Sequence, residues 1–179
     1  YARDGFTSII HGKWWHEETV ATASHARGAP DSPRDGHYLV LLTVEDAERI
    51  CNFLRSGCPA PDVPQLEDYF KNSRSPGFDF TRHLDRIGVA NQTTMLSSES
   101  LHIASMFRDA MIARFGEEAL AEHFRSFDTI CNATQERQDA VLEMMQDPPD
   151  IMLVVGGFNS SNTSHLAEIT QRHCPTYYV

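Results

Sequence analysis

Short β-rich segments alternate with helical segments along the whole chain, and this alternation limits the possible folds more than any other feature of the sequence. The pattern predicts strands at residues 6–10, 38–41, 87–90, 124–127 and 151–155. Parallel strands need long crossover connections, and helices usually supply them, so the pattern predicts an α/β fold with small parallel sheets. The last of these segments, Ile-Met-Leu-Val-Val, is apolar throughout, which is typical of a strand buried on both faces.

The segment after the second predicted strand has clear helix signals at both ends. Thr43 is a good N-cap, acidic residues follow in the first turn, and Gly57 marks the end. Cys51 lies on the apolar stripe of this helix, so we expect a buried, inert thiol. Residues 59–85 are rich in Pro and Gly, which predicts a surface loop with one helix at about 66–72.

Composition excludes several classes of function. The chain has 15 basic and 25 acidic residues, a formal charge of −10, which argues against a nucleic-acid surface. No apolar run approaches the ~18–20 residues that a membrane-spanning helix needs. The four cysteines form no CxxC pair, so neither a zinc ribbon nor a disulfide scaffold is indicated, and we expect a reducing compartment. The chain starts at Tyr1 without a signal peptide, so we expect its true N-terminus to be missing.

Polar turns follow several of the predicted strands, at the edge of a parallel sheet where ligands usually bind. The first contains His11, His16 and Glu18. These side chains suit a metal site, or an anion bound by His16 with Glu18 as proton source. The alternative is a polar helix start, in which acidic residues favour the helix dipole. The second turn, residues 91–94, offers amides and hydroxyls for a ligand, or for capping and turn formation alone.

Two later turns carry different chemistry. Cys131 lies at a predicted strand-to-helix turn, where backbone N–H groups stabilise a thiolate. It suits a nucleophile or a metal or cluster ligand, and a buried inert thiol is the alternative. Residues 156–165 combine two glycines with several hydroxyls and amides before a helix. This pattern favours an anion site that needs no lysine.

Four motifs together resemble those of one enzyme family. In order they are HGKWWHEETVATAS, GVANQTTM, DTICNATQERQDAV and MLVVGGFNSSNTSHLAEI. They are similar to motifs of the 4-hydroxy-3-methylbut-2-enyl diphosphate reductases, in their plant and cyanobacterial branch. The match spans residues 9–169 and is loose only over residues 25–85.

The resemblance implies three α/β lobes, each with a parallel sheet, around a [4Fe-4S] cluster held by three cysteines. Residues 1–127 would be the second, middle lobe and residues 128–179 the beginning of the third. The first lobe and the C-terminal end would be absent. The implied reaction belongs to the non-mevalonate isoprenoid pathway. It is the reductive removal of an allylic hydroxyl, giving isopentenyl and dimethylallyl diphosphates.

The same resemblance implies residue roles. Cys131 would be one cluster ligand, and the other two would lie upstream. Glu18 would supply a proton, working with Thr93 at the substrate hydroxyl. The residues implied for the diphosphate are His16, Ser160, Ser161 and Asn162. No other cysteine of the chain stands at a matching place, so we expect the chain alone to hold no stable cluster and to be inactive.

The implied partners are an allylic diphosphate substrate and a ferredoxin- or flavodoxin-type electron donor. The implied location is the plastid stroma in a eukaryote or the cytoplasm in a bacterium. Two other hypotheses stay open. A non-catalytic phosphosugar- or nucleotide-binding module would bind its ligand regardless of Cys131 and Glu18. A metal-dependent hydrolase built on His11, His16 and Glu18 would bind metal without Cys131.

Overall fold

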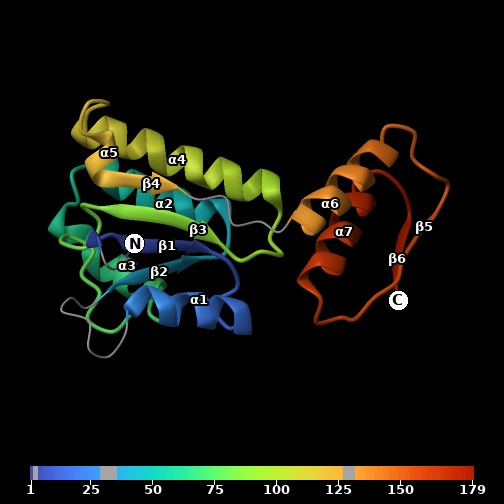
Figure 1. Ribbon diagram of the computed structural model, residues 1–179, viewed down its shortest axis with the longest axis horizontal. Helices are drawn as coiled ribbons and strands as arrows, with labels where there is room; N and C mark the ends of the chain where they lie inside the picture. The colour runs from blue at the N-terminus through green and yellow to red at the C-terminus, as the bar shows by residue number, and fades with distance from the viewer. Residues whose placement is uncertain (2–3, 29–35, 127–131) are drawn as a thin grey trace. The chain divides into compact units, whose positions relative to one another are not determined.

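The computed structural model describes residue 1 and residues 4–28, 36–126 and 132–179. The chain divides into two compact units (Figure 1). The first comprises residues 1–92 and 99–128, and the second comprises residues 93–98 and 129–179. The assignment of these units to particular lobes of a larger protein stays a prediction.

A four-stranded sheet forms the centre of the first unit, with the order β2-β1-β3-β4. The strands are β1 (Thr7–His11), β2 (Tyr38–Leu41), β3 (Ile87–Asn91) and β4 (Phe124–Ser126). Each lies where the sequence predicts a strand, and all three neighbouring pairs are parallel. The parallel α/β fold class is therefore confirmed. His11 is in register with Leu41 and Asn91, so the polar turns that follow begin at one edge of the sheet.

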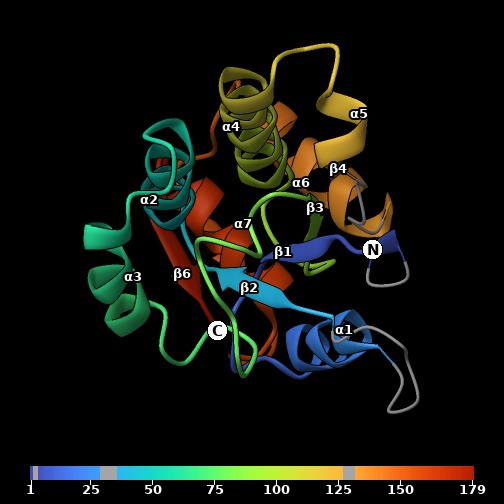
Figure 2. The ribbon, with the colours of Figure 1, turned by 90° about the vertical axis from the view of Figure 1, so that its left-hand side faces the viewer.

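Helices cover both faces of this sheet (Figures 1 and 2). They are α1 (Glu17–Arg27), α2 (Val44–Arg55), α3 (Val63–Tyr69), α4 (Ser97–Phe115) and α5 (Leu120–His123), with a 3₁₀ turn η2 (Ala60–Asp62). Side chains alternate between the faces of a strand. Accordingly, Ile9 joins the core under α2 and α4, while Ile10 packs with Ala23 of α1 on the other face.

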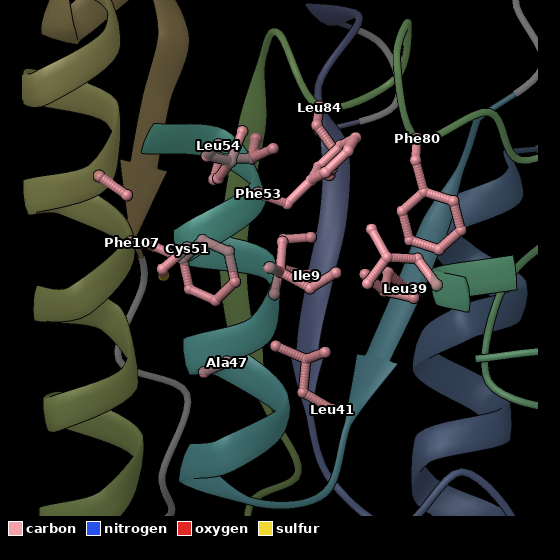
Figure 3. Packing of buried hydrophobic residues seen from close by; sticks show 14 of the residues in the cluster. Ile9, Leu39, Leu41, Ala47, Cys51, Phe53, Leu54, Phe80, Leu84 and Phe107 are labelled. Carbon is pink, nitrogen blue, oxygen red and sulfur yellow. The ribbon is translucent and has the colours of Figure 1, made fainter. Parts of the chain in front are cut away.

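The larger core lies between the sheet and α2, where Ile9, Leu39 and Leu41 face the helix (Figure 3). Thr43 and Asp46 form the capping box that begins α2. Cys51 is fully buried, as predicted. The predicted surface exposure of residues 59–85 is wrong in part. Five side chains of this segment are buried because they pack into the larger core beside α2. They are Leu66, Phe70, Phe78, Phe80 and Leu84.

The second unit contains α6 (Asn132–Met144), β5 (Met152–Val154), α7 (Ser161–Gln171) and β6 (Thr176–Tyr178). The two strands pair in parallel, and both helices lie on the same side of them in Figure 1. A small core forms there, made of Leu96, Met145, Ile169 and Cys174.

The prediction that residues 151–155 are buried on both faces is wrong. Ile151, Leu153 and Val155 are 55%, 61% and 77% exposed. Among the described residues, β5 pairs only with β6, and the helices cover one face of the pair. The apolar run thus forms a strand that is covered on one face, although its composition is typical of a strand covered on both faces.

Within the part of the chain that the structure describes, no helix has both the length and the apolar composition that crossing a membrane requires.

Candidate functional site

The first polar turn joins β1 to α1 and is organised by His16. This residue is the N-cap of α1, with its Nδ1 accepting the backbone N–H of Glu18 at 3.3 Å. The polar helix start considered as an alternative is therefore present. Because Nδ1 accepts, a neutral ring carries its hydrogen on Nε2, and that N–H is a donor suited to an anion.

Gln92 connects this turn to the end of β3 through hydrogen bonds. Its buried Oε1 accepts from the Thr19 hydroxyl at 3.0 Å and from the Lys13 backbone N–H at 3.1 Å. Gly12 lies so close that a Cβ there would be 2.7 Å from Thr19 Oγ1. The side-chain carbonyl oxygen of Gln92 is thus used in turn formation, which is one of the two hypotheses for residues 91–94.

His11 is fully buried, and its Nδ1 lies 2.8 Å from Ser100 Oγ. Among the described residues, no group of three or more His, Cys, Asp or Glu side chains is placed to hold a metal ion. His11, His16 and Glu18 consequently do not form such a group, and the geometry gives the hydrolase hypothesis no support.

Gln138 of α6 anchors the segment 93–98, which contains Thr93, to the second unit. Its Oε1 accepts from the Ser97 backbone N–H at 3.1 Å, and its Nε2 donates to the Met95 carbonyl at 3.2 Å. No role for Gln138 was predicted from the sequence. The available signal was its helical spacing with Val141 and Met145, which places a polar side chain on the buried stripe.

The glycine-rich turn leads into α7 through Ser160. Ser160 is the N-cap, and its Oγ accepts from the backbone N–H of Thr163 at 3.3 Å and from the Thr163 hydroxyl at 2.9 Å. A Cβ at Gly156 would lie 2.7 Å from the Thr163 side chain, so the turn packs tightly against its own helix. Ser161 is buried and Asn162 is partly buried.

Comparison with known proteins identifies the family. The family described as "LytB protein" matches residues 1–179. The chain belongs to this family. The resemblance seen in the four motifs is thus confirmed.

Two cyanobacterial relatives are named 4-hydroxy-3-methylbut-2-enyl diphosphate reductase. The one from Picosynechococcus is 48% identical over 180 residues, covering 100% of this chain and 42% of the relative. The one from Thermosynechococcus vestitus is 48% identical over 175 residues, covering 97% and 40%. The chain therefore spans less than half the length of the relatives that it matches.

A solved structure of the E-1-hydroxy-2-methyl-but-2-enyl-4-diphosphate reductase from Plasmodium falciparum has a similar fold. The TM-score is 0.62 at 18% identity, covering 99% of this chain and 42% of that one. At this identity the likeness concerns the fold alone.

The residues implied by the LytB resemblance fall into three groups. His16 and Glu18 share the first turn of α1 in the first unit. Four others belong to the second unit, namely Thr93, Ser160, Ser161 and Asn162. Cys131 lies outside the described residues. Convergence of all three groups on one ligand stays a prediction.

The described cysteines do not fit a cluster, because all three are buried free thiols. Burial raises the pKa of Cys51 to about 12. Burial also raises the pKa of Cys58, against the opposing effect of Arg114. Cys174 packs in the core of the second unit. Since iron binds the thiolate, the raised pKa values of Cys51 and Cys58 disfavour the ligand form.

Proposed function

We propose that the complete protein containing this chain is a 4-hydroxy-3-methylbut-2-enyl diphosphate reductase of the non-mevalonate isoprenoid pathway. The reaction uses two electrons and two protons, releases the allylic hydroxyl as water, and gives isopentenyl or dimethylallyl diphosphate. The observation that supports this most is membership of the LytB family over all 179 residues, with relatives named for this reaction at 48% identity.

The diphosphate would bind at the start of α7. The first turn of a helix presents N–H groups and a partial positive charge, which favour an anion. Ser160 and Asn162 add a hydroxyl and an amide there, and Ser161 adds a second hydroxyl. The Nε2–H of His16 would be a further donor. These local donors matter because the chain as a whole carries a formal charge of −10.

The proton for the leaving hydroxyl would come from Glu18. Its carboxyl lies in the first turn of α1, two residues after the N-cap His16. The hydroxyl of Thr93 would hydrogen-bond the substrate hydroxyl and hold it for this transfer. A carboxylic acid within hydrogen-bond reach of a leaving oxygen is a standard general acid.

Cys131 would hold a [4Fe-4S] cluster together with two cysteines outside this chain. When bound, the cluster would supply electrons and an iron that acts as a Lewis acid. A ferredoxin- or flavodoxin-type protein would reduce it. The protein would act in a bacterial cytoplasm or, in a eukaryote, in the plastid stroma, and the likeness to cyanobacterial relatives supports this proposal.

Substitution of Glu18 tests the proposed proton source. In the complete protein, Glu18→Gln should lower kcat by at least about 100-fold, because the acid is lost while the amide keeps its shape. Glu17→Gln is the matched control, since Glu17 is the exposed neighbour in the same helical turn, and it should stay within about twofold. Equal rates for the two variants would contradict the role of Glu18.

Substitution of Cys131 tests the cluster. In the complete protein, Cys131→Ser should abolish the cluster's visible absorption and lower bound iron, while Cys174→Ser should leave both unchanged. A protein that binds diphosphate but contains no cluster and turns over no substrate would instead support the phosphosugar-binding alternative.

A further inference from the structure

Two polar atoms at the start of α7 are buried and have no hydrogen-bond partner among the residues that the structure describes: Asn162 Oδ1 and His165 Nε2. His165 is only 6% exposed. Leaving a buried polar atom unsatisfied lowers stability, so such atoms usually mark a partner or a function. The two residues are three apart in one helix, and therefore lie next to each other on its surface.

Glu168 fixes the orientation of the His165 ring. Glu168 Oε2 lies 3.0 Å from His165 Nδ1. A carboxylate only accepts hydrogen bonds, so Nδ1 carries a hydrogen. The other ring nitrogen, Nε2, faces the protein interior. Helical side chains also tilt toward the N-terminus. His165 thus lies over the first turn of α7, beside Asn162.

The Asn162 amide can present either its oxygen or its nitrogen to a neighbouring anion. Its Oδ1 is the buried atom, so the Nδ2 donor faces the other way. An Nε2–H on His165 would donate to this oxygen and hold the amide in that orientation. A bare Nε2 would instead favour the opposite orientation, with the oxygen turned toward the anion.

The charged residues of this turn also favour a role for His165 beside a bound anion. Residues 156–171 contain no Lys or Arg, and His165 is their only basic side chain. A ring that donates from both nitrogens is an imidazolium. It would place one positive charge beside the anion, where the turn has otherwise only neutral donors.

We propose that His165, oriented by Glu168, is a positioning residue of the diphosphate site. When diphosphate binds, the Nε2–H of His165 donates to Asn162 Oδ1 and thereby turns the Asn162 amide N–H groups toward the diphosphate. The inference rests on the proposed role of the α7 start in binding diphosphate.

Two variants of His165 separate positioning from packing. His165→Asn keeps an amide nitrogen close to the position of Nδ1, within reach of Glu168, but loses the donor at Nε2. His165→Gln places an amide nitrogen near Nε2 and so keeps that donor. Calorimetric titration of the complete protein with inorganic diphosphate measures the difference. The Asn variant should bind about tenfold more weakly, as expected for one lost charge-assisted hydrogen bond, and the Gln variant within about threefold of the unsubstituted protein.

Steady-state kinetics adds a second measurement. The Asn variant should raise KM for the allylic diphosphate with little change in kcat, because the lost contact does not touch the reacting carbon–oxygen bond. Equal diphosphate affinity in both variants, or equally weakened affinity with a lowered Tm in both, would overturn the proposal in favour of a packing role.

Glu168→Ala provides a test outside the core, since the Glu168 side chain is 51% exposed. It should weaken diphosphate binding about threefold by releasing the ring, and unchanged affinity would contradict the proposal. The outcomes also separate the two proposals. An inactive but diphosphate-binding protein would remove only the reductase assignment. A normal KM for His165→Asn in an active enzyme would remove only the role of His165.

Discussion

Both units combine parallel strands with helices, yet they bury their apolar side chains to different degrees. In the first unit, four strands lie between helices, and Leu39, Leu41 and Leu54 are fully buried. In the second, two strands are covered on one face, and Leu153 is 61% exposed. An apolar strand sequence thus sets which residues form a strand, but neighbouring chain segments decide whether its side chains leave water.

The polar turns differ in a related way. In the first unit, Gln92 accepts hydrogen bonds from Thr19 and Lys13 and so ties the turn together. In the second, Asn162 and His165 each keep a buried atom that has no partner in the described part of the chain. Side chains thus hold both turns, since Ser160 accepts hydrogen bonds from Thr163 in the second, and the second also has bonding capacity that a bound ligand could use.

The largest expected difference concerns leucine truncation. Leu54→Ala should lower the free energy of unfolding of this chain by about 2–5 kcal/mol, because it leaves a cavity in the first core. Leu153→Ala is the matched substitution in the second unit and should cost less than about 1 kcal/mol. Urea denaturation followed by circular dichroism measures both. Similar costs would mean that Leu153 is buried in solution.

The two structural glutamines provide the next comparison. Gln92→Ala and Gln138→Ala should each cost about 2–3 kcal/mol, because each removes two hydrogen bonds and leaves buried partners unsatisfied. Hydrogen exchange should locate the loss in the first unit for Gln92 and in the second for Gln138. Exchange that rises in both units for either variant would show that they unfold together.

Two glycines test how tightly the turns pack. Gly12→Ala and Gly156→Ala should each cost about 1–2 kcal/mol, since the new Cβ would lie 2.7 Å from a threonine side chain in either turn. Gly157→Ala is the control, because no atom of the described residues lies within 4 Å of a Cβ there. Thermal unfolding distinguishes them. A stable Gly156→Ala variant would show that the second turn is looser than the first.

The smallest expected effect is a pH dependence confined to the first unit. Burial, and then the neighbouring His37, lower the pKa of His83. The His37 and His83 rings are stacked with their centroids 3.7 Å apart, and His83 Nδ1 accepts a hydrogen bond from the backbone N–H of Asp79. Arg82 also lowers this pKa, while Asp79 opposes the shift. The folded state thus favours neutral His83, and the unfolded chain binds more protons.

Stability from this source is therefore present above the unfolded pKa of about 6.5 and is lost as the pH falls through the lower folded value. His83→Gln should flatten the dependence of Tm on pH in that interval. His173→Gln, at an exposed position of the second unit, should leave it unchanged. An unaltered slope in the His83 variant would assign the pH dependence to other groups.

Sequence reasoning located the strands and the capped helix α2 because these depend on local signals. Thr43 and Asp46 act within one helical turn, and apolar spacing along a strand needs no distant partner. The prediction of surface exposure for residues 59–85, which rested on their Pro and Gly content, was wrong in part. Phe78 and Phe80 are buried there because the core beside α2 has space for them, which no local pattern records.

The sequence by itself determined the parallel α/β class, the family and the polar turns, since backbone preferences and motif order are local properties of the chain. Only the tertiary structure showed that Gln92 and Gln138 bind across distances of 73 and 41 residues, because such hydrogen bonds form only after the chain has folded. It also decided that Leu153 stays exposed and that His165 turns its Nε2 inward. Burial is set by what packs against a residue, and the residue's own chemistry does not specify that partner.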